Sequence, residues 1–174
     1  MKRLVIPAMA ACFAALLVSS CEKNNPQPTP DYVGTWDYSY RTLDGEDTLD
    51  IRDVLTLEAD TYEEIIQYRN ETYMTSLKSF AGIRGGLSVD GYTMTVAVNQ
   101  LAISSADDNL MPTGSLMWYS KGSQEYYQLV SSLGVAESFS SDYSIAGDVM
   151  TMLVDLNHDG DFQDPGEVSI YDRQ

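Results

Sequence analysis

Apolar and polar residues alternate with a period of two along much of the chain after Tyr32. Trp36, Tyr38 and Tyr40 alternate with polar residues, and residues 62–68 show the same alternation. Successive side chains of a β-strand point to opposite sides, so this period is typical of strands with one buried face. Aspartate–glycine and glycine–aspartate pairs between these segments predict tight turns. The pattern therefore predicts an all-β domain of short antiparallel strands.

Two pairs of segments refine this picture. Residues 87–98 and 143–154 share the form apolar, Ser, β-branched, x, Gly, x, x, Met, Thr, x, x, Val, which predicts two hairpins. Residues 123–133 are the one candidate for a helix, although they fit a strand equally well, and Asn70–Phe80 is similarly ambiguous. Successive short strands with tight turns favour an up-and-down antiparallel β-barrel of about eight strands, with a β-sandwich as the alternative.

Gly34-Thr35-Trp36 opens the first predicted strand, and Arg173 lies near the end of the last one. This pair of features resembles the lipocalin superfamily. The resemblance implies an eight-stranded barrel in which Gly34 and Trp36 occupy the closed end and Arg173 lies over the indole ring. The order of motifs along residues 32–174 is similar to that of lipocalin-like lipoproteins of Gram-negative gut bacteria.

The inward face of such a barrel would line a ligand cavity. The candidate ligand-binding residues are those that share this face in the first and third predicted strands: Trp36, Tyr38, Tyr62, Ile66 and Tyr68. Glu64 falls on the same face, where it would anchor a ligand inside the barrel or lie at its rim. Its neighbour Glu63 points to the opposite face, so the two glutamates are not expected to act as a pair.

The first twenty residues have the form of a secretory signal, with Lys2 and Arg3 before an apolar run. The run ends in Leu17-Val18-Ser19-Ser20-Cys21, which resembles the lipobox of bacterial lipoproteins and implies lipid attachment at Cys21. The expected organisation is a signal peptide (1–20), a lipidated cysteine with a proline-rich tether (21–31) and one β domain (32–174). The resemblance implies membrane anchoring through the lipid, in the outer membrane, at its periplasmic face or at the cell surface.

The net charge argues against one class of partner, and the cysteine content against one source of stability. The formal net charge of −16 becomes more negative once Lys2 and Arg3 leave with the signal, and such an acidic surface repels nucleic acid. Cys12 leaves with the signal and Cys21 carries lipid, so the mature domain has no disulfide. Its stability must come from packing, hydrogen bonds or a bound metal.

One acidic loop, residues 155–167, has metal-ligand spacing. Oxygen-bearing side chains at alternate positions with Gly160 at the sixth resemble the first half of an EF-hand calcium loop. The candidate calcium ligands are Asp155, Asn157, Asp159, Asp161, Asp164 and Glu167. The flanks are predicted strands and Glu167 lies one position late, so we expect a structural calcium loop of an envelope protein. An acidic, solvated turn is the alternative.

The expected function is binding. His158 is the only histidine, so Ser–His–Asp, Cys–His and histidine–zinc sites lack parts, and no catalytic residue is predicted. We expect a lipid-anchored binding module for a small apolar or amphipathic ligand, or for an envelope protein. The alternative is a structural or accessory surface lipoprotein with no pocket and an exposed aromatic patch around Trp118, with Tyr119, Tyr126 and Tyr127. An enzyme, ranked last, would need a cleft in which carboxylates of perturbed pKa converge.

Overall fold

The computed structural model describes residues 29–44, 47–70, 79–106, 112–155, 159, 161–164 and 166–174. The predicted lipid-attachment residue Cys21 and most of the tether lie outside the described residues, as do residues 71–78 of the ambiguous segment. In the described part of the chain, no helix is both long and apolar enough to cross a lipid bilayer.

The described chain forms strands along most of its length, with a single helix. In chain order these elements are β1 (Gly34–Asp44), β2 (Asp47–Leu57), β3 (Thr61–Asn70), β4 (Ser79–Asp90), β5 (Thr93–Ala106), β6 (Pro112–Ser120), α1 (Gln124–Leu133), β7 (Ser138–Ala146), β8 (Val149–Leu153) and β9 (Val168–Arg173).

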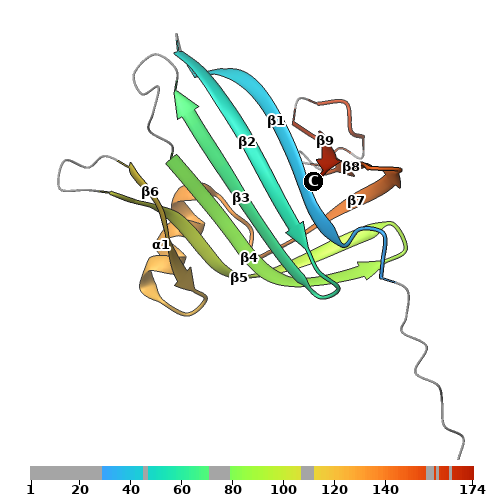
Figure 1. Ribbon diagram of the computed structural model, residues 1–174. Helices are drawn as coiled ribbons and strands as arrows, with labels where there is room; N and C mark the ends of the chain where they lie inside the picture. The colour runs from blue at the N-terminus through green and yellow to red at the C-terminus, as the bar shows by residue number, and fades with distance from the viewer. Residues whose placement is uncertain are drawn as a thin grey trace, which may run out of the picture.

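All neighbouring strands pair antiparallel in the order β4-β3-β2-β1-β9-β8-β7-β5-β6, and β4 also pairs with β5 (Figure 1). This last pairing closes eight strands into a barrel. Residues Thr93 to Ala97 of β5 pair with β7, whereas Gln100 to Ala106 pair with β6. The predicted eight-stranded antiparallel barrel is confirmed, and the sandwich alternative is wrong. The additional strand β6, next to α1, was not anticipated from the sequence.

Both predicted hairpins are confirmed, since β4 pairs with β5 across Gly91 and β7 pairs with β8 across Gly147. The ambiguous segment 123–133 is a helix rather than a strand. Its N-cap is Ser123, whose Oγ accepts a hydrogen bond from the Tyr126 amide at 3.1 Å. Gly134 ends the helix in the left-handed conformation, a common C-terminal signal.

Alternation places the core inside the barrel. Along β2, Ile51, Asp53, Leu55 and Leu57 are buried, whereas Arg52 between them is exposed. The largest fully buried side chains come from β1, β2, β5, β8, α1 and the residue before β9: Trp36, Tyr126, Leu55, Leu57, Met94, Leu101, Met150, Glu167, Val96 and Val98. The helix contributes to this core through Tyr126, whose hydroxyl donates to the Val98 carbonyl at 3.2 Å.

Trp36 and Arg173 are direct partners in the β1–β9 pairing. The Arg173 guanidinium lies 4.1 Å from the centroid of the Trp36 ring, the contact expected from the sequence. Arg173 Nη1 also donates to the Val33 carbonyl at 2.9 Å. A Cβ on Gly34 would lie 2.8 Å from that same Nη1, so the glycine leaves the space that the guanidinium fills.

The wall between β4 and β5 contains an irregularity at Gly85 that predicts a mutational result. A Cβ there would collide with the Ala97 carbonyl oxygen and lie 3.2 Å from Val96 Cγ1, whereas a Cβ on the adjacent Gly86 meets no atom within 4 Å. We expect Gly85→Ala to lower the free energy of unfolding by about 1–3 kcal/mol, because the backbone must shift. Gly86→Ala should leave it unchanged or raise it by roughly 0.4–1 kcal/mol.

Chemical denaturation of both variants measures this difference. Equal stability of the two would show that the strands at Gly85 are further apart than described.

Candidate functional site

A cavity of about 880 Å³ opens inside the barrel, and two of its lining residues, Asp53 and Tyr171, lie further along the strands from Asp31 than Trp36 does. The β1–β2 register shows this order, because Trp36 lies opposite Leu55, and Tyr38 lies opposite Asp53, further along the strand. The wall combines apolar side chains with a few polar ones. It comprises Asp53, Tyr62, Glu64, Ile83, Gly134, Val135, Ala136, Ser138, Phe139, Ser140, Ser141, Met152, Val154, Asp155, Ser169 and Tyr171.

Two carboxyl groups meet in this wall. Asp53 of β2 and Glu64 of β3 lie on the same face as diagonal neighbours, since Glu64 pairs with Leu55 and Asp53 pairs with Ile66. Each also accepts a hydrogen bond from a tyrosine. Tyr171 donates to Asp53 Oδ2 at 2.6 Å, and Tyr62 donates to Glu64 Oε2 at 3.0 Å.

Burial sets the protonation of this pair. Burial and, to a smaller extent, the negative charge of Asp53 together raise the pKa of Glu64 to about 8. Burial also raises the pKa of Asp53, although the hydrogen bonds from Tyr171 and Glu64 oppose this rise. At neutral pH the proton therefore resides on Glu64, which donates it in a hydrogen bond to the Asp53 carboxylate.

The Asp53 carboxylate is only partly satisfied. Asp53 is only 8% exposed, and its Oδ1 has no hydrogen-bond partner among the described residues. A buried, unpaired carboxylate oxygen is costly, so a group that binds there is expected to stabilise the protein.

The pair also borders two smaller cavities. Asp53 contributes to one of about 250 Å³ with Tyr38, Tyr40 and Tyr68, and Glu64 contributes to one of about 190 Å³. The ring centroids of Tyr38 and Tyr171 are 5.5 Å apart. The carboxyl pair therefore contributes to the walls of three cavities, which also contain several tyrosine rings.

The predicted ligand-binding residues divide into two groups. Tyr38, Tyr62, Ile66 and Tyr68 line these cavities. Trp36 is fully buried in the core and is not among the described residues that line them. Its ring contacts Arg173 instead, and Gly34 leaves space for that guanidinium.

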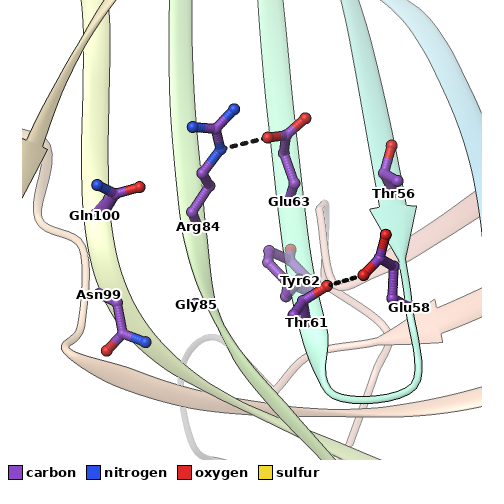
Figure 2. A pocket seen from close by; sticks show the side chains of 9 residues that line it. All are labelled: Thr56, Glu58, Thr61, Tyr62, Glu63, Arg84, Gly85, Asn99 and Gln100. Carbon is purple, nitrogen blue, oxygen red and sulfur yellow. Dashed lines mark hydrogen bonds and ion pairs between the residues drawn. The ribbon is translucent and has the colours of Figure 1, made fainter.

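Glu64 lies inside the barrel rather than at its rim, and Asp53 was overlooked in the sequence. The signal for Asp53 was present, because an acidic residue replaces an apolar one in the inward phase of β2, between Ile51 and Leu55. Glu63 points outward and forms an ion pair with Arg84 beside a second, outer depression of about 390 Å³ (Figure 2). The two adjacent glutamates therefore act on opposite faces, as expected.

The acidic loop is only partly described, and Asn157 lies outside the described residues. Asp159 Oδ1 accepts from the Asp161 amide at 3.0 Å, and Asp161 Oδ1 accepts from the Gln163 amide at 3.0 Å. Glu167 is buried, and its carboxylate accepts from the Asp164 amide at 3.1 Å. Asp155 lines the large cavity. Within the described residues, no group of three or more ligating side chains gathers around one point, so calcium binding stays a prediction.

The predicted aromatic patch is divided between core and surface. Tyr126 is fully buried, and Trp118 is half-buried with the Arg84 guanidinium 3.8 Å from its ring centroid. Tyr127 is 48% exposed. The four aromatic residues thus do not form a single exposed surface.

Comparison with known proteins does not assign the chain to a family or the cavity to a ligand. No protein-family model matches the chain. No curated protein is significantly similar to it.

Proposed function

We propose that this chain is a lipid-anchored cell-envelope protein that binds a small molecule inside its β-barrel. The observation that carries the proposal is the interior cavity of about 880 Å³, with Asp53 and Glu64 in a largely apolar wall. Small-molecule sites are typically concave, of roughly 300–1,000 Å³, and combine apolar walls with a few convergent polar groups. A carboxyl with a pKa raised to about 8 is also typical of a functional site.

The anchoring part of the proposal rests on the lipobox-like sequence before Cys21. The tether would reach the barrel at Asp31, whose carbonyl accepts a hydrogen bond from Arg173. Two residues of the cavity wall lie further along the strands from Asp31 than Trp36 does. An anchored barrel would therefore face the membrane with the end nearest Trp36 and keep the cavity accessible from solution.

A native mass spectrum of the protein purified from its own host tests both parts. We expect a chain that starts at Cys21, carries acyl groups and retains a non-covalent small molecule. An empty barrel would contradict the binding proposal, and an unacylated chain would contradict the anchor.

Catalysis is the second candidate function, because the cavity holds the convergent carboxyls of raised pKa that an acid–base enzyme needs. In glycoside hydrolases the two catalytic carboxyls stand roughly 5–9.5 Å apart, with the reacting bond between them. Here the two carboxyls are hydrogen-bonded to each other, which favours binding. Incubation of the recovered ligand with fresh protein separates the two candidates, since a binding protein leaves the ligand unchanged.

We also propose a structural calcium ion in the loop 155–167, as its sequence spacing predicts. We expect calorimetric titration of the mature domain with calcium to give binding heat at millimolar concentration or below, together with a higher melting temperature. Magnesium is the control, because its stricter octahedral geometry suits this loop less well. Absence of both heat and thermal shift at millimolar calcium would remove the metal from the account.

A further inference from the structure

The unpaired oxygen of Asp53 indicates the charge of the ligand. Asp53 is more than nine-tenths buried, it lines the cavity of about 880 Å³, and its Oδ1 has no partner among the described residues. Its other oxygen already accepts from Tyr171. A hydrogen-bond donor that enters the cavity and reaches Oδ1 would complete the set of bonds that this carboxylate can accept.

The cavity has a negative electrostatic character. Asp53 and Asp155 lie in its wall beside the protonated Glu64, and no lysine, arginine or histidine is among the described residues that line it. A carboxylate held away from water and from any basic side chain attracts a positive charge more strongly than an exposed one does. An anionic ligand would be repelled, and a purely apolar ligand would bury Oδ1 without a partner.

The remaining wall suits the hydrocarbon part of an organic cation. Tyr62 and Phe139 pack edge to face with their centroids 5.8 Å apart, and Tyr171, Met152 and Ile83 line the same cavity. Aromatic faces attract ammonium groups as well as hydrocarbon. A metal ion fits less well, because a hard cation requires six to eight oxygen ligands. No group of three or more ligating side chains is found in the described part of the chain.

We propose that the barrel cavity binds a small organic cation, a primary amine whose ammonium group donates to Asp53 Oδ1 and to the neighbouring Glu64. This inference rests on the proposed binding function and specifies the class of its ligand. The three N–H donors of a primary ammonium match the two carboxyls and the buried Ser141, which also lines the cavity. The alkyl or aryl group of the amine lies against Tyr62 and Phe139.

Calorimetry on the unaltered protein tests the charge directly with ligands of matched shape. The probes are 2-phenylethylamine and hexylamine, the neutral alcohols 2-phenylethanol and hexanol, and the anion 3-phenylpropionate. We expect the amines to bind about 10- to 100-fold more tightly than the alcohols, the range for a hydrogen bond to a charged group. The anion should not bind.

Asp53→Asn provides a second test, since it removes the charge and keeps the shape. We expect a loss of amine affinity of about 10- to 100-fold. Asp172→Asn is the matched control, because it changes the net charge by the same amount. Asp172 is exposed on β9, next to Tyr171 in the chain. Should Asp53→Asn fail to fold, the comparison of ligands in the unaltered protein still decides the question.

The outcomes separate this inference from the proposed function. Alcohols that bind as tightly as the amines would overturn the charge assignment and leave the binding function intact. Calcium or magnesium that displaces the amine competitively would make a metal the occupant and overturn it as well. If no probe of the series binds, the amine inference fails, and the native mass spectrum decides separately whether the barrel holds any ligand.

Discussion

Replacement of Trp36 by alanine is expected to lower the free energy of unfolding by about 3–5 kcal/mol, the range for truncation of a large core aromatic. The indole is fully buried, and its Nε1 donates to the Tyr32 carbonyl at 2.9 Å. Truncation leaves a cavity, an unpaired carbonyl and a guanidinium without its aromatic partner. Because native stabilities are about 5–15 kcal/mol, this change alone would bring the domain close to unfolding.

The measurement is guanidinium denaturation followed by circular dichroism. The chain offers a matched control in its other tryptophan, Trp118 of β6, which is half-buried under Arg84 on the strand outside the eight-stranded barrel. Trp118→Ala should cost clearly less than Trp36→Ala. An equal cost for the two substitutions would show that Trp36 has no special role in the stability of the barrel.

The free energy of unfolding is expected to fall as the pH rises from 5 to 9. This is the opposite of what is expected for a domain whose carboxylates are stabilised by ion pairs, which loses stability as the pH falls. The pKa of Glu64 is about 8 in the folded protein and 4.5 without the fold, so between these values the folded state binds more protons. The stabilisation is fully present below pH 4.5 and is lost as the pH rises through 8. For one such group, the free energy of unfolding falls by at most about 1.4 kcal/mol per pH unit.

Asp53 acts in the same direction, because burial raises its pKa in the folded state too. Burial also raises the pKa values of Tyr62 and Tyr171 above the ordinary value of 10, so these groups titrate outside this pH window. The slope between pH 5 and 9 therefore reports mainly on the carboxyl pair.

Glu64→Gln should flatten this slope and make the variant more stable than the unaltered protein at pH 9, since the amide never ionises. Glu63→Gln is the control one residue away. Glu63 faces outward and pairs with Arg84, so its replacement should leave the slope unchanged. Melting temperatures of the three proteins across the pH range test this. An unchanged slope in Glu64→Gln would mean that Glu64 is ionised in the folded state at neutral pH.

The parts of the fold that could be predicted are those that depend on residues close together in the sequence. The alternation around Trp36 and along residues 62–68 was sufficient to predict strands, and the turns at Gly91 and Gly147 were sufficient to predict hairpins. Residues 123–133 stayed ambiguous because so short an apolar–polar pattern fits the periods of both a helix and a strand. The cap at Ser123 and the burial of Tyr126 against β5 decided for the helix.

The candidate site was predicted only in part, for a related reason. Glu64 was placed on the inward face by alternation alone. Its contact with Asp53 depends on the β2–β3 register, and the contact of Asp53 with Tyr171 joins residues 118 positions apart. Side-chain phase along one strand contains no information about either contact.

The sequence by itself indicated which side of the chain is buried around Trp36 and along residues 62–68, because that depends on the local alternation of side chains. The stack of Arg173 on Trp36 was expected only through the resemblance of Gly34-Thr35-Trp36 and Arg173 to the lipocalin superfamily, and the structure contains it. Only the tertiary structure decided that β4 meets β5 to close the barrel, that β6 remains as an additional strand, and that two acids share one cavity. Register and closure bring together residues far apart in the chain, and it is their shared burial that changes the chemistry of the carboxyls.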